Sequence, residues 1–274
     1  MSTFMPMLYS AWDSDIAYSF RKSRVAVIST LLLLAMFLAA ILAPHLAPQN
    51  PFDIAELSLF DSELPPAWAE GGNPAYLLGT DTQARDVLSS IMYGMRISLV
   101  VGFASVLLAA VLGVTLGLLG GFLGGIVDAV LMRIADVLLS FPPILVALLI
   151  NGVLRGALPQ SAQADSALIV LILSIGLTNW VQYARTVRGS TMVLVIATIN
   201  LGMAVLTEAT LSFLGVGMPP TQPSLGTLIQ IGNEFLFSGI WWVVVFPAAA
   251  LAVLVLAVNL LGDWLRDALN PKLR

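Results

Sequence analysis

Long apolar runs separated by short polar stretches dominate the hydropathy pattern of this chain. Helical segments of about 20 apolar residues cross a bilayer, and six runs reach or approach that length. They cover residues 25–43, 97–119, 126–154, 167–181, 193–216 and 241–261. The pattern therefore predicts an all-α integral membrane protein with about six transmembrane helices.

The composition agrees with a membrane protein and argues against most other classes. The chain is 58% hydrophobic and only 10% charged, whereas soluble domains carry about 25% charged residues. No basic stripe indicates nucleic-acid binding. There is no cysteine, a single histidine (His45) and no glycine-rich phosphate-binding loop with a lysine, so we expect no enzyme activity, no metal site and no cofactor in this chain.

Polar stretches divide the chain into five regions. The first apolar run is longer than a signal-peptide core of about 7–15 residues, so we expect it to remain as an anchor. The polar stretch that follows it has seven acids against Arg85 alone, up to residue 92. The predicted regions are an N-terminal tail (1–24), an anchor helix (25–43), an acidic polar segment expected on the outer side (44–96), a transmembrane helical core (97–262) and a C-terminal tail (263–274).

The basic residues predict the orientation, because Lys and Arg concentrate on the cytoplasmic side of membrane proteins. With both termini inside, nine of the twelve basic residues lie on the cytoplasmic side. The outer set is then Arg85, Arg96 and Arg155. This distribution predicts that both termini are cytoplasmic.

Several local patterns carry finer expectations. Gly113, Gly117 and Gly121 recur every four residues and favour close approach of another helix. Residues 86–93 are expected to form a short separate helix at the membrane surface.

The third apolar run carries charges and a proline pair. Arg133 and Asp136 are one turn apart and able to pair, and Pro142 with Pro143 should interrupt or kink the helix. Beyond it, Trp180 and Tyr183 suit a membrane interface.

Glu208 lies near the middle of the fifth run, where a carboxylate is costly. It either lines a polar pathway, together with Asn200 and Thr207, or makes a structural hydrogen bond to another helix. Phe141 and Pro142, at the proline-rich turn of the third run, are further candidates for lining a pathway.

Three parts of the chain resemble one family. Residues 19–53 (SFRKSRVAVISTLLLLAMFLAAILAPHLAPQNPFD) are similar to its N-terminal anchor, and residues 78–99 (LGTDTQARDVLSSIMYGMRISL) to its LGTD-x-x-GRD-x-x-SR segment. Its C-terminal half resembles residues 207–228 (TEATLSFLGVGMPPTQPSLGTL), Trp241, Trp242 and residues 262–273 (GDWLRDALNPKL). The family is that of the C-type permease subunits of ABC importers for dipeptides, oligopeptides and nickel.

The resemblance implies a type I ABC importer permease fold in the bacterial inner membrane, forming half of a pathway for peptides or a related small solute. It implies a homologous second permease, two cytoplasmic ATPase subunits that hold the ATP, and a periplasmic solute-binding protein. Asp81, Arg85 and Asp86 become candidates for a periplasmic gate or a contact with the binding protein. Ala84 departs from the family, which usually has glycine there.

A larger departure concerns the connector of residues 182–192, whose Arg185 and Arg188 are candidates for facing the ATPases. The family carries a coupling loop here, with Glu-Ala-Ala, a glycine and then Ile-x-Leu-Pro. In this chain Arg188 is followed by GSTM and then directly by Val193. The coupling-loop pattern is therefore absent.

Three interpretations follow. The chain is a transporting permease subunit, or it is an uncoupled or scaffold paralogue that assembles without transporting. The sequence could also lack a segment that an intact version carries. A secondary transporter or channel is a more distant alternative, disfavoured by the scarcity of charges inside the apolar runs and the lack of visible inverted repeats.

Overall fold

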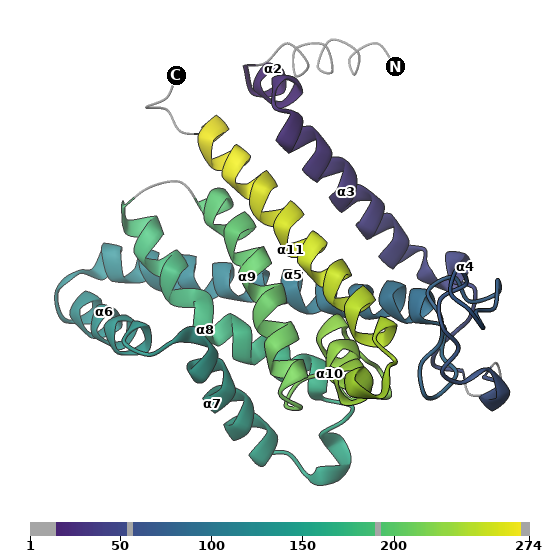
Figure 1. Cartoon of the computed structure of the whole chain (residues 1–274). Helices are drawn as coiled ribbons and strands as arrows, with labels where there is room; N and C mark the ends of the chain where they lie inside the picture. The colour runs from purple at the N-terminus through teal and green to yellow at the C-terminus, as the bar shows by residue number, and fades with distance from the viewer. Residues whose placement is uncertain (1–14, 54–56, 190–192, 270–274) are drawn as a thin grey trace, which may run out of the picture.

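A computed structural model describes residues 15–53, 57–189 and 193–269, and the regular elements in these ranges are helices (Figure 1). The first half contains α2 (Asp15–Lys22), α3 (Arg24–Ile41), α4 (Ala43–Leu46), the 3-10 helix η2 (Leu59–Asp61), α5 (Val87–Leu123) and α6 (Gly125–Leu139). The second half contains α7 (Pro143–Gly156), η3 (Gln160–Ala162), α8 (Ala167–Gly189), α9 (Val193–Phe213), α10 (Leu225–Phe235), η4 (Leu236–Ser238) and α11 (Trp242–Leu269).

Five of these helices are long and apolar enough to cross a membrane, or six when the bent pair α6–α7 counts as one span. This confirms the predicted all-α fold with about six spans. α3 and α11 lie side by side at one edge of the bundle (Figure 1). Only 22% of the apolar window of α3 is buried, against 67% for α8, so α3 is a peripheral helix and α8 is central.

Small residues allow α5 and α8 to approach each other closely. A Cβ atom added at Gly113 would lie 2.3 Å from the carbonyl oxygen of Trp180, and one at Gly117 would lie 2.6 Å from that of Ala184. The predicted glycine strip is thus confirmed at these two positions. It does not extend to Gly121, where an added Cβ would meet nothing within 4 Å.

The start of α5 corrects the prediction of a separate surface helix at residues 86–93. One continuous helix of 37 residues begins at Val87, with the Asp86 side chain accepting a hydrogen bond from the backbone N–H of Ser89 as its N-cap. Gly94 does not break it, because this glycine packs closely against Ser224 and Leu225. Tertiary packing therefore joins two segments that looked distinct in the sequence.

The predicted interruption at Pro142 is confirmed as a sharp bend of 102° between α6 and α7. The charge pairing next to it was predicted wrongly. Asp136 forms its ion pair with Arg185 of the neighbouring helix α8, whereas Arg133 is exposed. The Asp136 carboxylate therefore pairs with an arginine distant in the sequence and not with Arg133, three residues before it on the same helix.

The aromatic residues near the end of α8 also differ from expectation. Trp180 and Tyr183 are buried against neighbouring helices and do not lie at an exposed interface. α8 continues well past the predicted end of the run at residue 181 and reaches Gly189. The polar stretch between the last two apolar runs contains a helix, α10, whose N-cap is Ser224.

Candidate functional site

The segment before α5 folds into a buried polar cluster around Asp81 and Arg85. The Arg85 backbone N–H and its side-chain Nε–H donate to the two carboxylate oxygens of Asp81, at 2.9 and 2.6 Å. The Arg85 guanidinium also donates to the carbonyl oxygen of Pro220 at 3.4 Å. Asp81 and Arg85 are both 3% exposed, so this ion pair ties the outer segment to the loop before α10.

Ala84 adopts an unusual conformation inside this cluster, with φ of +59°. Glycine reaches this left-handed region without the steric conflict that a Cβ introduces. The structure thus gives a physical reason for the family's usual glycine at the position where this chain carries alanine.

Asp86 makes a second set of contacts at the same end. Its carboxylate accepts hydrogen bonds from the Ser89 backbone N–H at 2.7 Å and the Ser89 hydroxyl at 2.5 Å. Gln49 also contacts this residue, because its side-chain oxygen accepts a hydrogen bond from the Asp86 backbone N–H at 2.8 Å. Burial raises the pKa of Asp86, and the bonds from Ser89 offset this only in part.

Trp242, the first residue of α11, donates its indole N–H to the carbonyl oxygen of Thr80 at 2.9 Å. The segment before α5 is therefore bonded to the arm after α3, to the loop before α10 and to α11. We call this set of residues the outer clasp: Gln49, Thr80, Asp81, Arg85, Asp86, Ser89 and Trp242. Because its charged members are buried, any contact with a partner would be made through the loops that the clasp holds in place.

Glu208 lies in a second polar cluster, at the centre of the bundle. Its side chain is fully buried. The hydroxyl of Ser98 on α5 and the hydroxyl of Ser212 on α9 each donate to one of its carboxyl oxygens at 2.7 Å. The two serines accept in turn from the backbone N–H groups of Leu225 and Met218. Glu208 thus links α5, α9 and the start of α10, an arrangement that favours the structural alternative raised for it.

The other pathway candidates do not meet Glu208. Asn200 is buried on the same helix, but it lies eight residues earlier, which is about 12 Å along the helix axis. Thr207 is partly exposed and donates its hydroxyl to the Met203 carbonyl oxygen of its own helix. Phe141 and Pro142 are exposed at the bend between α6 and α7. These residues do not form one site in this chain.

The opposite end of the bundle is held differently. α8 and α9 are separated only by residues 190–192, which lie outside the described residues together with the side chain of Arg188. Arg185 pairs with Asp136 of α6, and both side chains are about half exposed. Of the two candidate ATPase-facing arginines, the structure therefore places Arg185 beside α6.

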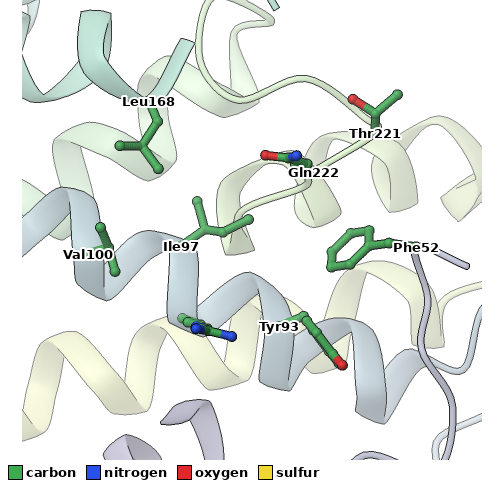
Figure 2. Close-up of a pocket in the computed structure, with 8 residues that line it drawn as sticks. Phe52, Tyr93, Ile97, Val100, Leu168, Thr221 and Gln222 are labelled. Carbon is green, nitrogen blue, oxygen red and sulfur yellow. The ribbon is translucent and has the colours of Figure 1, made fainter. Parts of the chain in front are cut away.

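A cavity of about 450 Å³ lies between the first turns of α5, the start of α8 and the loop before α10. Figure 2 shows Ile97, Leu168, Gln222 and Phe52 around it. Arg96 contributes the only charged side chain among the residues that line it. Sequence reasoning missed this cavity, and a single arginine beside the second apolar run was the only signal that could have suggested it.

Comparisons with known proteins agree on the class of this chain. A family model described as the N-terminal TM domain of oligopeptide transport permease C matches residues 10–66. A second, described as binding-protein-dependent transport system inner membrane component, matches residues 189–274. The second match begins at the connector between α8 and α9.

Curated relatives align over nearly the whole chain. A dipeptide transport system permease protein of Haemophilus influenzae is 36% identical over 94% of this chain and 94% of its own length. The protein of that name in Escherichia coli K12 is 38% identical over 93% and 91%. A di/tripeptide transport system permease protein of Pseudomonas aeruginosa is 34% identical over 98% and 95%.

The Haemophilus influenzae alignment extends over 290 positions, which exceeds the 274 residues of this chain. Part of that relative therefore faces a gap, in keeping with the absent coupling-loop pattern. The matched family models, the identity over nearly the full length and the all-helical bundle lead to one conclusion. The chain belongs to the family of binding-protein-dependent transport permeases, the inner-membrane subunits of ABC importers, and is similar to their C-type dipeptide permeases.

Proposed function

We propose that this chain forms half of the pathway by which an ABC importer moves di- or oligopeptides, or a related small solute, across the bacterial inner membrane. The observation that carries the proposal is the similarity, over more than nine-tenths of the chain, to permeases named for dipeptide transport. Both termini are cytoplasmic in this proposal, because that orientation places nine of the twelve basic residues inside.

The proposed partners are a homologous second permease, two cytoplasmic ATPase subunits and a periplasmic solute-binding protein. ATP is bound and hydrolysed by the ATPases, and this chain contributes no catalytic group. An exposed stripe along α5, formed by Val100, Leu107 and Val111 at helical spacing, offers an apolar surface to the bilayer or the second permease.

The contact with the ATPases is proposed at the end of the bundle where α8 meets α6. The ion pair between Arg185 and Asp136 joins these two helices at an exposed surface. In a permease without the family's coupling loop, this exposed surface and the connector after it are the parts available to receive the motion of the ATPases.

A pull-down tests the proposal. This chain is co-expressed with its partner permease and ATPases, purified through a tag on this chain, and assayed for the ATPases and for substrate-stimulated hydrolysis. A matched version carries a family-type coupling loop inserted after Arg188.

The proposal predicts that the chain as it stands recruits both ATPases and supports stimulated hydrolysis. If only the loop-containing version does so, the proposal fails for this chain, and the uncoupled or scaffold interpretation takes its place.

A further inference from the structure

The cavity beside α5 combines an exposed charge with apolar walls. Its volume is about 450 Å³, and it opens between the arm after α3, α5, α8 and the loop before α10. Arg96 lies nine residues after the start of α5, which is about 14 Å along the helix axis. The cavity is therefore well separated from the first residue of the helix and lies beneath the loop that the outer clasp holds.

Arg96 differs from the two other basic residues expected on the outer side. Arg85 is paired with Asp81, and Arg155 donates to the carbonyl oxygen of Gly217. Arg96 is exposed and forms neither a hydrogen bond nor an ion pair within the described part of the chain. A charged residue on a spanning helix that faces a cavity without a partner indicates a functional site by default.

The rest of the lining determines what kind of anion would fit. Thr221 and Gln222 come from the loop before α10, and their side chains make no hydrogen bond within the described ranges. Val100 and Leu168 supply apolar walls, and the ring of Tyr93 meets that of Phe52 edge to face with centroids 5.2 Å apart. Figure 2 shows Leu168 and Phe52 on opposite sides of the space, with Gln222 and Ile97 between them.

The lining thus offers one guanidinium, one amide and one hydroxyl beside apolar and aromatic side chains. A guanidinium binds a carboxylate through two parallel hydrogen bonds. An amide and a hydroxyl supply further donors, and the apolar walls suit a hydrocarbon or aromatic side chain next to that carboxylate. The C-terminal residue of a peptide has this combination, whereas its N-terminal ammonium would be repelled by Arg96.

We propose that the Arg96 cavity is a subsite that binds the C-terminal carboxylate of a peptide on its way into the translocation pathway. This inference rests on the proposed peptide-transport function and adds to it a residue that distinguishes free peptides from amidated ones. The phosphate of an anionic phospholipid is the competing ligand for an exposed arginine, and the experiment separates the two.

Cysteine labelling tests the subsite directly, because the chain has no cysteine of its own. Thr221→Cys places a thiol on the cavity, and Ala75→Cys places one at an exposed position of the outer segment away from it. The assembled complex is purified without the binding protein into nanodiscs of phosphatidylcholine. The rate of labelling by a neutral maleimide is measured with dialanine, with dialanine amide and without peptide.

The expected result is that dialanine slows labelling at position 221 about fivefold or more and leaves position 75 unchanged. Dialanine amide should slow it much less, because it lacks the carboxylate. Arg96→Gln should abolish the protection by dialanine, whereas Arg133→Gln, which removes an exposed arginine on α6, should preserve it.

Two outcomes would overturn the subsite. Equal protection by the free and amidated peptides would show that the carboxylate is not recognised. In a second preparation, phosphatidylglycerol replaces part of the phosphatidylcholine; slower labelling there, with no effect of either peptide, would assign Arg96 to a lipid phosphate. Peptide uptake by the complex with the unaltered chain is measured separately. If that uptake is absent, the proposed transport function fails, whatever the labelling shows for the subsite.

Discussion

The two ends of the helical bundle are stabilised by different kinds of contact. At the outer clasp, Asp81 and Arg85 form an ion pair with side chains 4% exposed, bonded to the loop before α10. At the other end, Arg185 and Asp136 pair with side chains 43% and 56% exposed. Burial makes the first pair energetically important, because an unpaired charge left in a buried site is costly, and hydration makes the second weak.

This difference coincides with the distribution of family features. The outer clasp contains Thr80 and Asp81 of the LGTD segment and one of the tryptophans that resemble the family, and its hydrogen bonds connect four parts of the chain. The other end lacks the coupling-loop pattern, so α8 and α9 follow each other with three residues between them. The comparison teaches that one end of the fold can keep its buried contacts while the connector at the other end lacks the family's coupling-loop pattern.

The largest expected effect comes from breaking the clasp with Arg85→Ala. Leaving Asp81 buried and unpaired should lower the free energy of unfolding by about 3–5 kcal/mol. The matched change Arg185→Ala at the other end should cost at most about 1 kcal/mol. Thermal unfolding of the detergent-purified chain measures both, and equal losses would remove the contrast between the two ends.

Removing the central carboxyl group with Glu208→Ala should lower the free energy of unfolding by roughly 3 kcal/mol, because it leaves the hydroxyls of Ser98 and Ser212 without their acceptor and opens a cavity. Glu208→Gln keeps an acceptor oxygen and should retain folding. The yield of monodisperse protein in size-exclusion chromatography reports the difference. If both variants fold like the unaltered chain and only transport changes, Glu208 lines the pathway after all.

Ala84→Gly should strengthen the clasp. The left-handed φ of Ala84 costs more with a Cβ than without it, so glycine should raise the free energy of unfolding by about 0.5–1 kcal/mol after its larger entropy in the unfolded chain is counted. Ala75→Gly, at an exposed position with negative φ, should instead lower it slightly. A decrease for Ala84→Gly in the same unfolding assay would mean that the backbone is not strained there.

Asp86→Asn sharpens the contrast through pH. Burial raises the pKa of Asp86 above its ordinary 3.8, so between these two values the folded state binds more protons than the unfolded state. The contribution of Asp86 to the free energy of unfolding is therefore fully present below pH 3.8. It is lost as the pH rises through the raised pKa of the folded state. An asparagine at this position does not titrate, so an unfolding series across this pH range should show a flatter profile for the variant. An unchanged slope would exclude Asp86 as its source.

Local patterns in the sequence are sufficient to predict the membrane-spanning helices, because about 20 consecutive apolar residues leave a membrane helix few alternatives. These patterns are less informative where tertiary packing determines where a helix begins or ends. Residues 86–93, predicted as a separate surface helix, are the start of α5. α10 lies in a polar stretch that contains several prolines, and Ser224 was the local signal for its N-terminus.

The candidate site was harder to predict, since its contacts connect distant parts of the chain. The bond from Ser98 to Glu208 joins residues 110 positions apart, and the bond from Trp242 to Thr80 joins residues 162 apart. No periodicity in the sequence encodes such pairings. A carboxyl group in an apolar run was therefore recognisable as important, but its serine partners were not.

Peptide uptake tests the central claim most directly. Cells lacking this subunit, but containing the partner permease, ATPases and binding protein, are supplied with the chain as it stands and given a radiolabelled dipeptide. The account predicts ATP-dependent uptake that is absent without the chain. A complex that assembles fully yet takes up no dipeptide, and gains uptake only after the coupling loop is inserted after Arg188, would contradict it.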